Sequence, residues 1–243
     1  MDIIKLNAIG STNTYLKELA TNQSLKNGTI VVAESQLKGR GQMGNAWQSQ
    51  QGKSLTFSMF HGFKSLDIAN AFIITSAVSL ALQKALTILQ IPKVTVKWPN
   101  DIMSDSKKLC GILVENQLEG SRIDSSIIGV GLNVNETEFT ALPQATSLKL
   151  ESGNTFDLDE VLTVVSKSIL HQLEQLETSN PATIRSAYEA VLFKKDTIAV
   201  FETTKGNRFN AIVRGVNQGG ALELETEDGA QIQSRIKELK MLF

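Results

Sequence analysis

A glycine-rich segment at residues 36 to 53 constrains the fold more than any other part of this 243-residue chain. Its spacing Gly39-x-Gly41-x-x-Gly44 matches the dinucleotide-binding fingerprint, which requires a helix directly after the turn. The residues that follow are polar, and those from 55 to 60 then alternate like a β-strand. The sequence therefore excludes a Rossmann fold and predicts a functional loop, because long connections without periodicity are uncommon inside compact domains.

The composition is that of an ordinary soluble protein, with 42% hydrophobic and 20% charged residues and a net charge of −1. This length can bury a full core and favours one larger domain plus a small one. The near-neutral charge gives no general attraction to DNA or to anionic membranes. A single cysteine, Cys110, excludes an internal disulfide framework, and residues 1 to 5 lack signal-peptide features, so a cytoplasmic location is expected.

Periodicity predicts a mixed arrangement of strands and helices up to residue 193. The expected strands are residues 3 to 6, 29 to 35, 55 to 60, 94 to 98, 110 to 115 and 126 to 133. One expected helix begins after Ser11, and three others cover residues 68 to 90, 158 to 177 and 181 to 192. The apolar stretch at 68 to 89 is interrupted by polar residues, which favours a buried helix over a membrane span.

From Lys194 onward the chain consists of short alternating segments separated by glycines. These segments lie at residues 197 to 202, 208 to 213, 221 to 225 and 231 to 234. Their spacing is typical of a small β-barrel. We therefore expect a first domain at residues 1 to 193 and a second at 194 to 243.

Two further features carry polar side chains into a possible cleft. Lys97, Asn100 and Asp101 flank Pro99, where strand pairing must stop, and their amide, carboxylate and amine groups suit a magnesium nucleotide. Taken alone, the Asn-Asp pair indicates no more than a turn. Arg40 in the glycine-rich loop supplies a planar fork suited to phosphate or carboxylate.

Glycines on two expected strands predict a slot for a flat ligand. Gly111 follows Lys108 on one strand, and Gly129 and Gly131 lie on the next. A single strand glycine more often marks a bulge. It is the ordered combination with the glycine-rich loop and the Trp-Pro corner that indicates a binding site.

These motifs together resemble those of the biotin protein ligases. The matching segments are residues 39 to 47, 97 to 101, 108 to 115 and 129 to 135, with Ser11-Thr12-Asn13. The resemblance implies an α+β fold, in which a mixed sheet with packed helices forms a class II synthetase-like catalytic domain, followed by an SH3-like β-barrel. Because the chain begins at the first catalytic strand, the expected form lacks the family's frequent N-terminal DNA-binding domain.

The resemblance also implies a two-step reaction. Biotin and MgATP first give biotinyl-5′-AMP, and biotin is then transferred to a lysine of a biotin carboxyl carrier domain. The expected protein is a monomer or homodimer that binds neither DNA nor membrane. The residues expected to be catalytic are Arg40, Lys97, Asp101 and Lys108.

The resemblance assigns further residues to the two substrates. Those expected around biotin are Ser11, Thr12, Asn13, Gln36, Gly39, Arg40, Ser58, Lys108, Gly111, Gly129 and Gly131. Those expected around the nucleotide are Gly41, Gln42, Gly44, Asn45, Trp47, Asn100 and Asn133, with Asn100 and Asp101 as the magnesium contacts. Gln42 departs from the family pattern, since many members have a second arginine there.

Two other functions fit parts of the sequence. A lipoate or octanoate protein ligase would share the fold but typically lacks the Lys-Trp-Pro-Asn-Asp corner. A catalytically weak biotin-binding module is the other alternative, and the intact Lys108 and Asp101 argue against it. His61, His171 and Cys110 form no cluster with metal-ligand spacing, so we expect the histidines to be structural or exposed and the cysteine to lie in the core.

Overall fold

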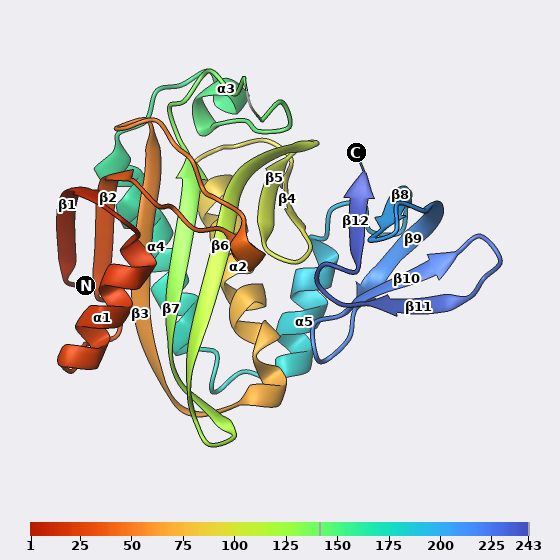
Figure 1. Ribbon diagram of the computed structural model, residues 1–243, viewed down its shortest axis with the longest axis horizontal. Coiled ribbons are helices and arrows are strands. Elements are labelled where there is room, and N and C mark those ends of the chain that lie inside the picture. The colour runs from red at the N-terminus through yellow and green to blue at the C-terminus, as the bar shows by residue number, and fades with distance from the viewer. Residues whose placement is uncertain (141, 243) are drawn as a thin grey trace.

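A seven-stranded mixed sheet forms the larger part of the computed structural model, which describes residues 1–140 and 142–242 (Figure 1). The strand order is β1-β2-β3-β7-β6-β5-β4, with β1 parallel to β2 and the other neighbours antiparallel. The strands are β1 (Ile3–Ile9), β2 (Ile30–Gln36), β3 (Ser54–Asp67), β4 (Val94–Lys97), β5 (Asp101–Ser104), β6 (Lys107–Glu119) and β7 (Arg122–Asn133).

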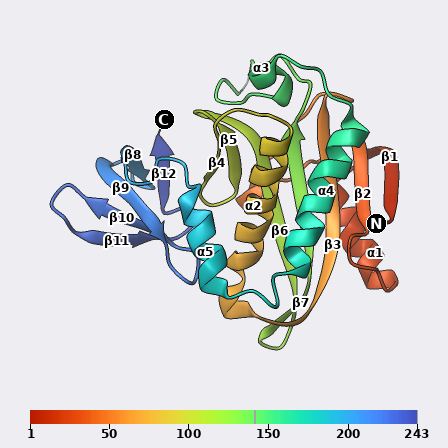
Figure 2. The same cartoon turned by 180° about the vertical axis from the view of Figure 1, so that it is seen from behind.

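Helices cover both faces of this sheet. Helix α1 (Thr12–Asn22) packs its Leu16 on Val31 and Ile127 on one face. The adjacent residues Ile30 and Ile128 belong instead to the large core on the opposite face. Successive strand side chains point to opposite faces, so this alternation separates two apolar layers. Figure 2 shows α2 (Phe72–Ile88), α4 (Leu158–Glu174) and α5 (Pro181–Ala190) together on the second face.

The long apolar stretch becomes the central core helix. By length and composition the segment Ile68–Ile88 would suffice to cross a membrane, so its polar residues do not by themselves exclude a span. In the fold, α2 packs against α4, α5 and the sheet, and Ile74, Val78 and Leu82 are fully buried. The helix begins later than predicted because Asp67 accepts a hydrogen bond from the Ala69 N–H and starts a 3₁₀ turn there.

A second, five-stranded antiparallel sheet follows, with strand order β11-β10-β9-β8-β12. Its strands are β8 (Ile198–Thr203), β9 (Arg208–Val216), β10 (Leu222–Thr226), β11 (Gln231–Ser234) and β12 (Leu239–Leu242). This agrees with the predicted small β domain, and β12 is an additional strand. Phe201 and Leu224 belong to the same apolar cluster as Tyr188 of α5, so the core continues across residue 193 and the proposed domain boundary stays a prediction.

The polar corner differs from the prediction. Asp101 does not end a strand; it opens β5 and pairs directly with Lys97 of β4. A four-residue strand after a proline corner offers too short an alternation to be recognised in the sequence. The short helix α3 (Leu148–Ser152), which is capped by the Ser147 hydroxyl, was also not predicted.

Candidate active site

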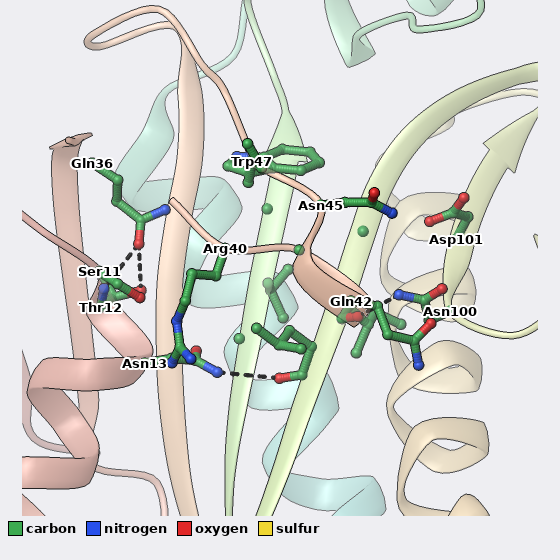
Figure 3. A pocket seen from close by; sticks show the side chains of 18 of the residues that line it. Ser11, Thr12, Asn13, Gln36, Arg40, Gln42, Asn45, Trp47, Asn100 and Asp101 are labelled. Carbon is green, nitrogen blue, oxygen red and sulfur yellow. Dashed lines mark hydrogen bonds between the residues drawn. The ribbon is translucent and has the colours of Figure 1, made fainter. Parts of the chain in front are cut away.

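The candidate site is a cavity of about 250 Å³ over the middle of the larger sheet. It lies on the α1 face, because Gly129 and Gly131 of β7 alternate in step with Ile127. Figure 3 shows its labelled side chains. The predicted site residues that line it are Ser11, Thr12, Asn13, Gln36, Arg40, Gly41, Gln42, Asn45, Trp47, Asn100, Asp101, Lys108, Gly111, Gly129 and Gly131.

The glycine loop, residues 39 to 47, folds as a tight hairpin beside this cavity. The Gly41 N–H donates to the Asn45 carbonyl at 2.6 Å, and the Trp47 N–H donates to the Gly39 carbonyl at 3.0 Å. Gly44 has a φ of +87°, a conformation that favours glycine. A Cβ at Gly39 would collide with the Trp47 carbonyl. Gly39 and Gly44 therefore shape the loop itself, and neither lines the cavity.

Trp47 and Asn13 occupy the predicted slot between the strand glycines. A Cβ at Gly131 would collide with the Trp47 indole, and one at Gly111 would lie 3.3 Å from it. A Cβ at Gly129 would collide with the Asn13 amide. The indole N–H of Trp47 is buried without a hydrogen-bond partner among the described residues. The slot therefore exists, and in this structure it holds side chains of the chain itself.

A hydrogen-bonded polar cluster forms one end of the cavity. The side-chain amide oxygen of Gln36, Oε1, accepts from the Thr12 backbone N–H at 2.8 Å and from the Thr12 hydroxyl at 3.2 Å. Ser58, fully buried beneath the cavity, lies 2.7 Å from the Thr12 hydroxyl and 2.5 Å from the Asn13 amide oxygen. Ser11 is the N-cap residue of α1, as predicted, but its side chain makes no cap bond; the side chain of Gln36 accepts from the first helical N–H, that of Thr12.

Cationic side chains gather at the other end. The Lys108 amine lies 2.5 Å from an Asp101 carboxylate oxygen. Burial lowers the pKa of Lys97; Asp101 raises it, and the nearby Lys108 and Lys240 lower it further. The charged groups that shift this pKa thus include one carboxylate and two amines. Lys97, Asp101 and Lys108 are partly buried and Lys240 is exposed, and this local excess of positive charge favours an anionic ligand.

The arrangement does not form a resident metal site. Across residues 1–140 and 142–242, no group of three or more His, Cys, Asp or Glu could hold a metal ion. The Asn100 amide donates to the Ile112 carbonyl at 2.7 Å and thereby fixes the corner to β6. One carboxylate, Asp101, suits magnesium only where substrate phosphates supply most of the ligands. The two predicted magnesium contacts stay a prediction.

Two adjoining cavities extend the site. One, of about 750 Å³, lies between residues 45 to 50 and the segment after β7, and both Lys97 and Asn133 line it. The Asn133 amide donates to the Thr146 carbonyl at 2.9 Å, so it fixes this segment. The other, of about 630 Å³, separates the two sheets and is lined by Lys97, Lys237 and Lys240. No sequence motif marks Lys237 or Lys240, so neither lysine was predicted.

The two histidines and the cysteine, for which the sequence predicts no metal-binding or catalytic role, also lie outside the candidate site. His61 is buried on β3, and burial lowers its pKa to about 4 although Glu177 raises it. His171 is exposed on α4, and Cys110 is buried in β6. Burial raises the pKa of the Cys110 thiol, which makes it a poor nucleophile. The predicted core position of Cys110 and exposed position of His171 are thus confirmed, and a structural role for the buried His61 stays a prediction.

Comparison with known proteins shows the family. Residues 6–133 match the biotin/lipoate A/B protein ligase family. The chain is 32% identical over 229 residues to the bifunctional ligase/repressor BirA of Escherichia coli, covering 92% of this chain and 69% of that protein. It is 28% identical over 236 residues to the biotin–[acetyl-CoA-carboxylase] ligase of Paracoccus denitrificans, covering 91% and 93%.

A solved structure supports the same assignment. The biotin protein ligase from Aquifex aeolicus in complex with biotin and ATP superposes with a TM-score of 0.80 at 28% identity, covering 99% of this chain and 98% of that one. The mixed sheet with packed helices, followed by a second antiparallel sheet, is the biotin protein ligase fold. The chain therefore belongs to the biotin/lipoate A/B protein ligase family.

Proposed function

We propose that this protein is a biotin protein ligase that activates biotin with ATP and transfers it to a lysine of a biotin carboxyl carrier domain. The observation that carries the proposal is the polarity of the cavity. Its Gln36–Thr12–Ser58 end offers hydrogen bonds to a polar ring, and the cations Arg40 and Lys108, which also line it, can pair with two anions. Biotin has a polar ring at one end and a carboxylate at the other.

In the first step, a biotin carboxylate oxygen bonds to the α-phosphorus of MgATP and the bond to the β-phosphate breaks. Two anions must approach each other, so their charge has to be neutralised. Arg40 and Lys108 serve the carboxylate and the α-phosphate. Lys97 and Asp101 serve the polyphosphate and the magnesium ion that arrives with it.

The polar cluster orients the other end of biotin. Because the Gln36 carbonyl oxygen already accepts from Thr12, the Gln36 amide nitrogen is left as a donor. Asn13 is engaged by Ser58 and by the β6 strand, so it positions the site more than it contacts substrate. On the nucleotide side, the loop residues Gly41, Gln42, Asn45 and Trp47 cover the adenylate.

In the second step, the amine of the carrier lysine bonds to the biotinyl carbon and AMP leaves. The mixed anhydride would otherwise hydrolyse, so the glycine loop must exclude water. The hairpin hydrogen bonds within the loop support such a cover. The carrier protein's identity, a monomeric or homodimeric state and a cytoplasmic location stay predictions.

A lipoate ligase is the less favoured alternative. A dithiolane ring offers no acceptor to the Gln36 amide nitrogen that is left as a donor, and a donor left unmatched in a closed site costs about 1–3 kcal/mol. The Paracoccus denitrificans and Aquifex aeolicus relatives above are likewise named as biotin ligases. A non-catalytic biotin-binding module would bind biotin but release no pyrophosphate.

The deciding experiment measures pyrophosphate release with MgATP and either biotin or lipoate. We expect release with biotin only, followed by labelling of a purified carrier domain. Release with lipoate alone would favour the alternative. Tight biotin binding without any pyrophosphate would indicate the binding module.

A further inference from the structure

Glu115 is a partly buried glutamate that contacts the glycine loop, and the proposed function gives it no role in binding a substrate. It lies on β6 opposite Ile127, and its side chain is 25% exposed. Its carboxylate accepts hydrogen bonds from Arg40 Nη2 at 3.0 and 3.2 Å and from the Asn13 amide at 2.8 Å. One carboxylate thus joins the glycine loop to the N-terminus of α1.

We infer that Glu115 is a positioning residue that holds the Arg40 guanidinium in the orientation that receives the carboxylate of the substrate. The inference rests on the proposed function, which gives Arg40 that anion. Figure 3 shows the Arg40 side chain running from the glycine loop toward Asn13. Without Glu115, this long side chain would have no anchor to fix its direction.

The geometry of the contact leaves Arg40 available to a ligand. Both Glu115 oxygens contact the same nitrogen, Nη2, and the described residues give the guanidinium no other side-chain partner. A guanidinium carries five N–H donors, so its other nitrogens stay open to a second anion. Glu115 therefore orients Arg40 without consuming its binding capacity.

Stability alone does not explain the pair. The Arg40 side chain is 47% exposed, and ion pairs this accessible contribute little to folding. A chain of hydrogen bonds runs from the same carboxylate through Asn13 to Ser58, Thr12 and Gln36, which form the polar end of the cavity. Glu115 therefore sets the position of the Arg40 guanidinium relative to the polar-ring end of the cavity.

The test compares biotin with biotinol, the neutral alcohol that has the same ring but no carboxylate. Calorimetric titration of both ligands is made with wild type, Glu115→Gln, Arg40→Ala and the double variant. The amide of Glu115→Gln keeps the shape but loses the charge that orders Arg40. Glu119→Gln is the matched control, since Glu119 is an exposed glutamate at the end of the same strand.

We expect Glu115→Gln to weaken biotin binding by about tenfold, since charge-assisted hydrogen bonds are roughly twice as strong as neutral ones. Biotinol binding should change by less than about twofold, as should biotin binding when Glu115→Gln is added to Arg40→Ala. Glu119→Gln should match wild type. If Glu115→Gln fails to fold, the same comparison is made with Glu115→Asp, which keeps the charge but shortens the reach.

Three results would overturn the inference. Equal losses for biotin and biotinol would indicate a purely structural role, and equal losses with and without Arg40 would show that Glu115 does not act through it. Tighter biotin binding by Glu115→Gln would mean that Glu115 competes with the ligand for Arg40. Failure of wild type to bind biotin at all would instead refute the proposed function.

Discussion

The Lys108 amine lies 2.5 Å from the Asp101 carboxylate, so the two residues expected to face the α-phosphate and the magnesium ion neutralise each other before either meets a substrate. They come from adjacent strands, β6 and β5, which pair through a register shift next to Lys108. Lys97 is the partner of Asp101 on the other side. An incoming polyphosphate would therefore displace the Asp101 carboxylate from the two lysines. Asp101 would then become available to magnesium.

Removal of either principal cation should nearly abolish the first step. We predict that Lys108→Ala and Arg40→Ala each reduce pyrophosphate release by roughly 10²–10³-fold, because each leaves an anion uncompensated in a site that excludes water. Lys205→Ala, at an exposed turn of the second sheet, is the control. Near-normal release by either site variant would refute the assignment.

The pH dependence of ATP use should report on Lys97. Burial, Lys108 and Lys240 hold the pKa of Lys97 below its usual value, and Asp101 opposes them. Its charged form exists below that pKa, so phosphate binding should be lost as the pH rises through it. Lys240→Gln removes one like charge and should move the alkaline limb of kcat/KM for ATP to higher pH. An unmoved limb would contradict this account.

His61 should limit stability in mild acid. Burial lowers its pKa to about 4, whereas an unfolded chain holds it near 6.5, so the unfolded state binds the proton first. Stability should therefore fall as the pH drops from about 6.5 to 4, by at most ~1.4 kcal/mol per pH unit from this group. Urea unfolding of His61→Phe should show a shallower acid slope than wild type, while exposed His171→Gln should not. Equal slopes in all three proteins would count against the explanation.

The second sheet should contribute to ATP affinity or to transfer. Deletion of residues 194–243 is predicted to impair these activities, but it would also uncover the shared core around Phe201 and Leu224. Trp98→Phe is a milder probe, because it keeps an aromatic ring and removes the indole hydrogen bond to the Gly220 carbonyl at 2.9 Å with part of the core packing. We expect a raised KM for ATP or for carrier with at most about 1.5 kcal/mol lost in stability. Unchanged steady-state kinetics for the truncated chain with both substrates would refute the role.

With Gln42, the glycine loop should hold the adenylate less tightly than it would with an arginine at this position. A neutral amide keeps hydrogen bonding but lacks a charge-assisted contact, which is roughly twice as strong. Gln42 lines the cavity, so the difference acts at the ligand. Incubation with biotin, MgATP and a lysine-rich bystander protein should give less bystander labelling with Gln42→Arg than with wild type. The control is Gln51→Arg, which adds the same charge outside the cavity; equal or greater labelling by Gln42→Arg would rule the idea out.

Much of this protein follows from local sequence patterns. Alternation and helical spacing are properties of short segments, so most strands, the buried helix and the small β domain could be predicted from them. The candidate site residues were predicted mostly from the resemblance to biotin protein ligases, whose motifs are also short segments. The glycine pattern points to the loop and to the slot, and the structure gives the reasons: a Cβ would collide at Gly39, Gly129 and Gly131, and Gly44 has a positive φ.

Only the tertiary structure decided what occupies those positions and which charges meet. Trp47 lies over Gly131, Asn13 lies over Gly129, and Glu115 of β6 binds Arg40 of the glycine loop, 75 residues away in the chain. Likewise, Lys240 of β12 approaches Lys97 of β4 only because the second sheet docks beside the polar corner. Such contacts depend on the order of strands within the sheet and on how the two sheets pack. Single-segment periodicity carries no information about either.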